Sequence, residues 1–405
     1  MQQQPILVVG ASVGGSTAAN TLVKAGIPVI LLERDLNFVK PCGGALPPVA
    51  FEEFDIPESL ISRKVHKAKI YSPSGRTAEI EVTGLQERNN DYVAMATREE
   101  LDPFLRQRAV DNGATLIEGT LTNLEFDADG VTVTYKAKST RKAETLRVAA
   151  VIGADGAYST TAKLLGQPRL PYCVAIQERI RLPDDKMERW QDTADLYLGR
   201  NVSPDLYAWV FPKSDHVAVG CGAGPGKTKE MRQFLANLKE RIEPHIRGGE
   251  IFLEEAHALP IHPRDHMAFE RAMLIGDAAG LVAGTSGEGI YWAMKSAQNA
   301  AEVLIRVLPD TSLATLRAEY ERKWWKEYGT MYRFLRWLQR WGYGNQRQME
   351  VFTDMCRNKD VQQLTFESYM YKEMAPAPWV AQLRMTADIV VSQVKHYIPG
   401  RVASL

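Results

Sequence analysis

The 405-residue chain has no long hydrophobic run: none of its apolar stretches approaches the roughly 18–20 residues that a membrane-spanning helix requires. It also has no net charge, because 49 lysine and arginine residues balance 49 aspartate and glutamate residues. A chain without a net field does not attract nucleic acid or an anionic bilayer unless its charges cluster locally. We therefore predict no nucleic-acid partner, and any membrane contact is expected to be peripheral.

Cysteine is scarce as well. The four cysteines stand far apart without a C-x-x-C pair, which excludes a zinc ribbon and favours a reducing compartment. Three histidines (His257, His262 and His266) are close in sequence, but prolines between them break any common helical face, and no carboxylate motif completes a ligand set. The sequence thus predicts no metal site.

The N-terminus leaves little room for a targeting segment, because an apolar strand begins at Pro5. This arrangement predicts a cytoplasmic, bacterial protein without a signal or transit peptide. At 405 residues the chain is longer than a typical single domain, and this length favours two domains with an appendage.

The chain does contain, from its start, a βαβ unit. Residues 5–33 read as a strand, a glycine turn, a helix and a second strand. In such a turn the backbone can approach a pyrophosphate at the helix N-terminus. Glu33 ends the second strand, where a carboxylate can accept hydrogen bonds from ribose hydroxyls. Ser12 stands where the middle glycine usually lies, so the phosphate approach is expected to be tighter. The turn residues assigned to the cofactor are Gly10, Ser12, Gly14 and Gly15.

The same turn fits a second pattern. Gly10-x-Ser12-x-Gly14 is also the nucleophile elbow of α/β-hydrolases, with a strand before it and a helix after it. An elbow normally follows several strands, whereas this turn follows the first, and a hydrolase has no need of Glu33. The dinucleotide interpretation is therefore favoured.

Two further strand ends carry aspartate and glycine. Asp155 follows one apolar strand, and Asp277 follows another between Gly276 and Gly280. The Asp277 carboxylate can accept a hydrogen bond from a ribityl hydroxyl while the glycines clear space for a cofactor. With three such strand ends in this order, the chain resembles the flavoprotein group that includes para-hydroxybenzoate hydroxylase. The resemblance implies that the cofactor is FAD.

The remaining segments predict an α/β (α+β) architecture. A helix from Arg98 to Asn112, a hairpin around Asp127–Gly130 and an apolar strand over residues 146–153 are expected to return the chain to the first sheet. Long strands around one helix, Lys227 to Ile242, predict an inserted antiparallel sheet. The expected parts are a Rossmann-like FAD-binding domain (1–66, 93–170 and 263–311), an interleaved antiparallel-sheet substrate domain (67–92 and 171–262) and a C-terminal helical region (312–405).

Three motifs narrow the family: Lys40-Pro41-Cys42-Gly43-Gly44, a segment from Tyr207 to Lys213 that reads YAWVFPK, and a segment from Ser286 to Tyr291 that reads SGEGIY. They are similar to signatures of the geranylgeranyl reductases, and the similarity runs nearly end to end. It is strongest to the enzymes of chlorophyll and tocopherol biosynthesis in cyanobacteria and plants. By this resemblance, further cofactor contacts are expected from Arg34, Cys42, Gly43, Gly44, Gly287, Gly289 and Ile290.

The resemblance also implies a function. It implies an NADPH-dependent flavoprotein oxidoreductase that reduces three of the four double bonds of geranylgeranyl diphosphate or geranylgeranyl-chlorophyll to give the phytyl chain. Family members work near photosynthetic membranes with light-harvesting-like proteins and chlorophyll synthase, which implies peripheral association with the thylakoid membrane. Two other functions stay open: an FAD-dependent monooxygenase of the same fold, which consumes oxygen, and a flavin-free prenyl-binding escort-type protein, which is colourless.

Cys42 is the candidate proton donor. An isolated alkene has no carbonyl to polarise it, so its saturation needs a hydride on one carbon and a proton on the other. The glycines after Cys42 permit close approach to the flavin, and a thiol is a modest proton donor. The alternative is a small cysteine that fills space.

Other residues are candidates for binding the substrate and the phosphate groups. Tyr207, Trp209 and Phe211 alternate along a strand and share one face, which can wall a slot for a polyprenyl chain or pack as ordinary core. Lys213 at the strand's end can meet a diphosphate or stay in solvent. Arg98, which opens a helix, matches the position from which the family's arginine approaches the flavin pyrophosphate; the alternative is a solvated arginine.

The C-terminal region contains an aromatic helix. Four large apolar residues recur at helical spacing (Phe334, Trp337, Leu338 and Trp341), and three arginines line another side (Arg333, Arg336 and Arg340). This pattern is typical of a helix at a membrane interface, and packing against the protein's own core is the alternative.

Overall fold

The computed structural model describes residues 4–81, 92–308, 315–372 and 391–392 of the chain. Contacts within the chain divide it into two compact units, each assembled from three stretches of sequence. The first unit comprises Met1–Lys40, Arg98–Tyr172 and Ala258–Arg333, and the second comprises Pro41–Thr97, Cys173–His257 and Phe334–Leu405.

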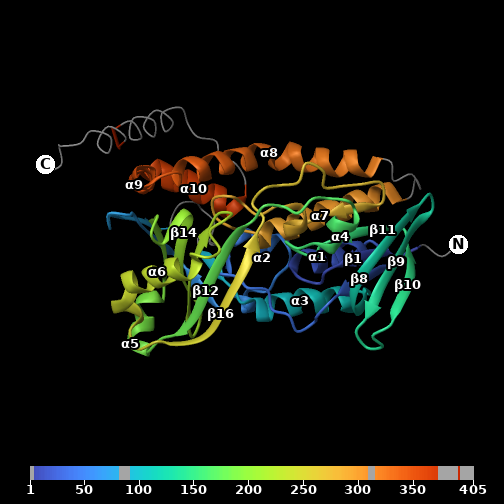
Figure 1. Cartoon of the computed structure of the whole chain (residues 1–405), viewed down its shortest axis with the longest axis horizontal. Coiled ribbons are helices and arrows are strands. Elements are labelled where there is room, and N and C mark those ends of the chain that lie inside the picture. Colours follow the sequence, from blue (N-terminus) through green and yellow to red (C-terminus); the bar gives the residue numbers. More distant parts are fainter. Residues whose placement is uncertain (1–3, 82–91, 309–314, 373–390, 393–405) are drawn as a thin grey trace, which may run out of the picture. The chain divides into compact units, whose positions relative to one another are not determined.

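A seven-stranded sheet organises the first unit (Figure 1). Five parallel strands run in the order β8-β2-β1-β11-β17, and β9 and β10 extend the sheet beyond β8 in antiparallel fashion. Strands β1 and β11 are buried along their whole length, as expected of parallel strands covered on both faces. The strands are β1 Ile6–Val9, β2 Val29–Glu33, β8 Thr115–Asp127, β9 Gly130–Ala137, β10 Ala143–Val148, β11 Ala150–Gly153 and β17 Ala272–Leu274.

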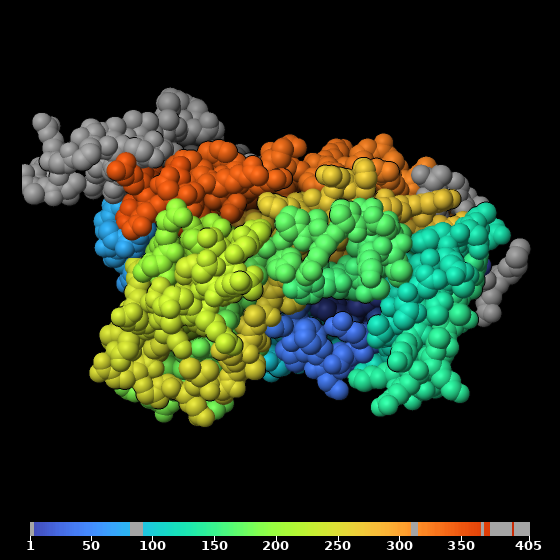
Figure 2. Space-filling view, in the orientation of Figure 1, coloured from blue at the N-terminus to red at the C-terminus, as the bar shows by residue number. Residues whose placement is uncertain are grey.

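Helices connect and cover these strands. Helix α1 (Val13–Lys24) packs against both α3 (Arg98–Asp111) and α7 (Ile290–Val307). Two short helices, α4 (Thr160–Leu164) and η3 (Gly276–Ala279), follow β11 and β17. A separate apolar cluster joins the side chains of β1 and β2 to those of β8, β9 and β10, whose surface is the teal region of Figure 2.

A second seven-stranded sheet organises the second unit, in the order β16-β12-β15-β14-β13-β5-β6. Its strands pair antiparallel from β12 to β13 and between β5 and β6, whereas β13 and β5 are parallel. The strands are β5 Lys67–Tyr71, β6 Thr77–Glu81, β12 Cys173–Arg181, β13 Thr193–Gly199, β14 Ser203–Pro212, β15 Val217–Ala223 and β16 Glu250–Leu259. A small sheet orders β3 (Ala45–Leu46), β7 (Val93–Met95) and β4 (Arg63–Val65).

Helix α6 (Met231–Ile246) covers one face of this second sheet. Its buried residues recur at helical spacing and pack against β12, β14 and β15: they are Met231, Leu235, Leu238 and Ile242. On β14, Ala208 and Val210 belong to the same cluster. The alternate residues of β14 therefore face the opposite side of the sheet.

The C-terminal helices are α8 (Leu316–Gly342), α9 (Gln346–Met355) and α10 (Lys359–Tyr371). Residues of α9 and α10 form an apolar cluster with β5, β6 and β13. In the turn between β5 and β6, Arg76 pairs with Glu350 at 2.5 Å and Asp354 at 2.7 Å on α9. The short helices are α2 (Val49–Glu53), η1 (Glu58–Leu60), α5 (Asp184–Met187) and η2 (Glu188–Trp190). None of the helices in the described part of the chain has both the length and the apolar character needed to cross a bilayer.

The predicted mixed α/β class is confirmed, and two element predictions were wrong in detail. The apolar run at 146–153 is two strands, because the chain changes partners at Ala149: β10 pairs with β9, and β11 pairs with β1. The helix expected at Lys227–Ile242 begins at Met231 and continues through Pro244. The two units also differ from the predicted domains, since residues 41–66 belong to the second unit and α8 contributes to both.

Candidate functional site

The turn after β1 has a backbone conformation that glycine alone supplies. Gly10 adopts a φ of +98°, and a Cβ there would lie 2.5 Å from the carbonyl oxygen of Ala154. A Cβ on Gly15 would lie 1.7 Å from the carbonyl oxygen of Gly10. Neither position has room for a Cβ, so only glycine there lets the chain turn tightly from β1 into α1.

Two helix N-termini lie side by side above this turn. Neither α1 nor α7 has a side-chain cap or an acidic residue in its first turn. The two first turns meet, because a Cβ on Gly14 would lie 3.1 Å from the carbonyl oxygen of Ala293. Two uncapped helix ends create a positive potential that attracts an anion. The pair therefore fits the pyrophosphate of FAD.

Arg98 lies at the same turn and binds Ser12, the serine that stands where a glycine is usual. The arginine is 3% exposed, and its guanidinium donates to both carboxylate oxygens of Asp102, at 2.7 Å each. It also donates to Ser12 Oγ at 2.7 Å, so the serine hydroxyl faces the arginine instead of capping α1. Burial rules out the solvated alternative, and the ion pair with Asp102 fixes the guanidinium beside the helix end.

Glu33 binds the turn from the end of β2. Its Oε2 accepts a hydrogen bond from the backbone N–H of Ala11 at 2.7 Å, and its Oε1 accepts one from Asp35 at 3.0 Å. Both oxygens thus bind the backbone around the end of β2, and the contact with a ribose stays a prediction. The neighbouring Arg34, also predicted to contact the cofactor, is exposed.

Asp277 has a partner that the sequence analysis missed. The aspartate is 6% exposed, and its Oδ2 accepts a hydrogen bond from Lys40 Nζ at 2.6 Å. Gly289, which precedes α7, lies so close that a Cβ there would be 3.5 Å from Asp277 Oδ1. The carboxylate therefore lies between a lysine and a helix N-terminus. Lys40 is the one charged residue of the Lys40–Gly44 motif, and that charge was the available signal.

The turn before α7 contains Gly287, another of the glycines predicted to contact the cofactor. Gly287 adopts a φ of +64° and donates its backbone N–H to the carbonyl of Ala283 at 2.9 Å. Ala283 in turn donates to the carbonyl of Glu288 at 2.9 Å. Ile290, the first residue of α7, is buried. These residues shape the helix start beside Asp277.

Asp155 binds the start of α4. Its carboxylate accepts hydrogen bonds from Ser159 Oγ at 2.5 Å, from the Thr161 backbone at 2.8 Å and from Thr161 Oγ1 at 3.0 Å. Burial raises the pKa of Asp155, against the pull of these hydrogen bonds. The carboxylate thus orders the turn after β11, and its contact with the cofactor stays a prediction.

In the second unit, Cys42, Gly43 and Gly44 form the loop before β3. Gly44 adopts a φ of +69°, its backbone N–H donates to Cys42 Sγ at 3.3 Å, and a Cβ there would lie 2.1 Å from the carbonyl oxygen of Ala96. Cys42 is half-buried, whereas the other three cysteines are buried. Burial raises the pKa of each of those thiols to about 12 (Cys173, Cys221 and Cys356). Cys42 is thus the accessible thiol of the four.

The aromatic residues of β14 share the face away from α6. The ring centroids of Tyr207 and Trp209 are 5.9 Å apart, and those of Trp209 and Phe211 are 6.1 Å apart. A Cβ on Gly43 would lie 3.0 Å from the ring of Phe211, so this aromatic face contacts the loop of Cys42. Tyr207 also packs against the apolar cluster beneath α9, and this end of the face is part of the core.

Lys213 is buried and binds the loop that carries Cys42. The residue is 3% exposed, and its Nζ donates to the carbonyl oxygen of Gly43 at 2.7 Å. The ammonium is therefore not in solvent, which excludes that alternative. Its predicted contact with a diphosphate stays a prediction.

Comparison with known proteins identifies the family. The family described as "FAD binding domain" matches residues 3–325. A geranylgeranyl diphosphate reductase from Synechocystis sp. is 42% identical over 400 residues, which cover 96% of this chain and 98% of the relative. The chloroplastic geranylgeranyl diphosphate reductase of Arabidopsis thaliana is 39% identical over 405 residues, covering 96% and 85% of the two chains. This chain belongs to the geranylgeranyl reductase family.

The fold of this family member is also found in a solved structure. A geranylgeranyl bacteriochlorophyll reductase-like protein from Thermoplasma acidophilum superposes with a TM-score of 0.73 at 22% identity, covering 98% of this chain and 100% of the other. FAD is accordingly the cofactor of this geranylgeranyl reductase family member. In the first unit, the groups that fit it are the paired helix ends, Arg98, Glu33 and Asp277.

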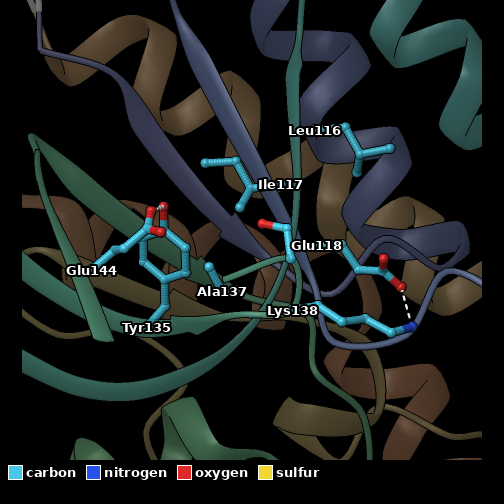
Figure 3. Close-up of a pocket in the computed structure, with 8 residues that line it drawn as sticks. Leu116, Ile117, Glu118, Tyr135, Ala137, Lys138 and Glu144 are labelled. Carbon is cyan, nitrogen blue, oxygen red and sulfur yellow. Dashed lines mark hydrogen bonds and ion pairs between the residues drawn. The ribbon is translucent and has the colours of Figure 1, made fainter. Parts of the chain in front are cut away.

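The pocket in Figure 3 is separate from these residues. It has a volume of about 430 Å³ and lies on β8, β9 and β10. Lys138 binds Glu118 at 2.5 Å and Asp35 at 3.2 Å, and Tyr135 donates to Glu144 at 2.8 Å. Because these polar groups form ion pairs and hydrogen bonds with one another, we assign the pocket no role. Within the described ranges, no three His, Cys, Asp or Glu side chains are grouped so that they could hold a metal ion.

Proposed function

We propose that this protein reduces geranylgeranyl diphosphate, or geranylgeranyl-chlorophyll, to the phytyl level, saturating three of the four double bonds with NADPH as the hydride source. The observation that carries the proposal is the 42% identity to the Synechocystis geranylgeranyl diphosphate reductase over 96% of this chain, because it extends through both units. A match confined to the first unit would support FAD binding alone.

The chemistry divides the work between cofactor and protein. Bound FAD, once reduced by NADPH, supplies a hydride to one alkene carbon. The chain must hold the cofactor, exclude water and deliver a proton to the other carbon. In the proposed scheme, Arg98 and the ends of α1 and α7 hold the pyrophosphate, Glu33 binds the ribose, and Asp277 binds the ribityl chain.

Cys42 is the proposed proton donor. Its Sγ accepts the hydrogen bond from Gly44, a bond that does not use the thiol hydrogen. The assignment rests on the Lys40–Gly44 motif, which is similar to a signature of the geranylgeranyl reductases, and on the partial exposure of Cys42, since the other three cysteines are buried.

The proposed substrate surface is the aromatic face of β14 beside Cys42. Trp209 and Phe211 offer stacked rings to an apolar chain, and Phe211 contacts the loop at Gly43. A polyprenyl chain has no groups for hydrogen bonding, so shape and apolar contact must align it. Lys213, whose Nζ binds the carbonyl oxygen of Gly43, is the proposed contact for the diphosphate.

We also infer peripheral contact with a membrane through the aromatic stripe of α8, which we define as Phe334, Trp337 and Trp341. The rings stack at 6.0 and 5.7 Å, and Phe334 and Trp337 are 47% and 55% exposed. Arginines at 333, 336 and 340 are exposed beside them. Aromatic rings at the bilayer boundary with cations at the headgroups would give access to a lipid-soluble substrate. Association with light-harvesting-like proteins and chlorophyll synthase stays a prediction.

Product analysis tests the proposed function. The purified protein is incubated with NADPH and geranylgeranyl diphosphate, prenyl products are followed by mass spectrometry, and oxygen by electrode. The proposal predicts stepwise gain of two hydrogens for each double bond, without oxygen uptake coupled to product. Insertion of oxygen would identify a monooxygenase, and a colourless protein that binds the prenyl chain unchanged would identify an escort protein.

A further inference from the structure

Gln177, on β12, connects the loop of Cys42 with the aromatic face of β14. The residue is 3% exposed. Its Nε2 donates to the carbonyl oxygen of Cys42 at 3.0 Å, and its Oε1 accepts from the indole N–H of Trp209 at 3.3 Å. One buried amide therefore binds both the proposed proton donor's backbone and the proposed substrate wall.

The orientation of this amide is fixed. Nε2 also donates to Glu255 Oε1 at 2.5 Å, and Arg179 binds that carboxylate at 2.9 and 3.4 Å. An indole N–H can only donate, whereas a carbonyl or carboxylate oxygen can only accept. Flipping the amide would break all three hydrogen bonds in a buried environment, so a single orientation is stable.

A second buried donor acts on the next residue of the loop. Lys213 binds the carbonyl of Gly43, directly after the carbonyl that Gln177 binds. The Gly44 N–H then binds Cys42 Sγ. Three successive residues of the loop are thereby held, which fixes the direction of the thiol relative to Trp209.

We propose that Gln177 is a positioning residue, which sets the distance from the Cys42 thiol to a double bond lying on Trp209. The catalytic part of this inference rests on the proposed function, whereas the control of the loop rests on the geometry alone. Loss of the amide is expected to slow the proton-requiring step by roughly 10- to 100-fold, because small displacements of a catalytic group cost that much. Reduction of the flavin by NADPH needs no positioned thiol and should be unchanged.

The test compares Gln177→Met with Glu178→Gln. Methionine is close to glutamine in size but cannot bind the three partners. Glu178, the next residue of β12, points to the opposite face and pairs with Lys239 at 2.8 Å, so its substitution weakens a partly buried contact away from Cys42. Gln177→Asn, which keeps an amide but shortens its reach, replaces Gln177→Met if that variant does not fold.

Two readouts separate the outcomes. The first is the rate of Cys42 alkylation by iodoacetamide at about pH 8, where buried thiols with pKa values of about 12 do not compete. The second is anaerobic reoxidation of the reduced enzyme by geranylgeranyl diphosphate. We expect Gln177→Met to change alkylation by about threefold or more and to slow reoxidation by at least about tenfold, with Glu178→Gln near the parent in both.

A folded Gln177 variant with parent values in both readouts would overturn the proposal. If instead Cys42→Ala reoxidises at the parent rate, the proton-donor assignment fails, and the alkylation rate alone then decides whether Gln177 holds the loop. A protein that never reduces the prenyl chain would refute the proposed function and leave that alkylation comparison intact.

Discussion

At the scale of single residues, the carboxylate of Asp277 is almost fully buried. It is stabilised by Lys40 and by the N-terminus of α7. We expect Asp277→Ala to weaken FAD binding, because it removes charge-assisted hydrogen bonds worth about 1.5–3 kcal/mol, or roughly 10- to 150-fold in affinity. Flavin fluorescence titration of the apoprotein measures this. Asp111→Asn, at an exposed acid that ends α3, is the control. Parent-like affinity in Asp277→Ala would refute the ribityl assignment.

The thiol of Cys42 gives a second prediction at this scale. Reduction of FAD by NADPH needs no protonated carbon, so Cys42→Ala should be reduced at nearly the parent rate. Reoxidation by geranylgeranyl diphosphate needs the proton, and loss of a positioned general acid typically slows such a step by ~10²–10⁴-fold. Anaerobic stopped-flow resolves the two halves. If reoxidation by the variant stays within about threefold of the parent, the proton comes from elsewhere.

At the scale of elements, the attachment of α9 to the β5–β6 turn depends on charge. Burial pushes the pKa of Glu350 up, but hydrogen bonds from Arg76 and from serines of the turn outweigh it and hold the pKa below its ordinary value of 4.5. The ionised form is thus favoured by folding, and this stabilisation is present above pH 4.5 and lost as the pH falls through the lower folded pKa.

Glu350→Gln should therefore destabilise the protein at neutral pH by about 1–3 kcal/mol, and its difference from the parent should shrink below the ordinary pKa of the carboxyl. Urea unfolding at several pH values measures the difference. Asp184→Asn, an exposed acid on α5, serves as the control. A Glu350→Gln effect that does not depend on pH would show that packing, not charge, attaches α9.

The aromatic stripe of α8 carries the next prediction. Trp337→Glu places a charge at the most exposed ring of the stripe and should reduce flotation with vesicles that contain anionic phosphatidylglycerol. Tyr158→Glu, at an exposed aromatic of the first unit, should float like the parent. Equal flotation of the folded Trp337→Glu variant and the parent would remove the stripe from the membrane proposal.

Helices and turns with a strong local sequence pattern were predictable from the sequence, but the strands and loops with which each element pairs were not. The glycine turn and α3 follow from spacing and apolar periodicity, which are local properties. The break at Ala149 could not be seen, because both halves of that run are apolar and only strand pairing separates them. Similarly, Lys213 follows an aromatic strand as a surface lysine would, and its burial depends on a loop 170 residues away.

At the scale of the whole molecule, each unit is assembled from three distant stretches of sequence. Such interleaving explains why the candidate site was predicted as residue types but not as contacts. Gln177 had no local signal, since its three partners lie up to 135 positions away. Lys40 and Asp277, 237 positions apart, belong to motifs that were each recognised, yet their ion pair exists only in the folded unit.

The central claim is that electrons pass from NADPH through FAD to an isolated prenyl double bond. The most direct measurement is anaerobic stopped-flow absorbance of the FAD-loaded protein, with NADPH added first and geranylgeranyl diphosphate second. The account predicts that NADPH bleaches the flavin and that geranylgeranyl diphosphate restores its colour, as products with two more hydrogens form. If geranylgeranyl diphosphate leaves the bleached flavin unchanged and only oxygen restores the colour, the account is contradicted.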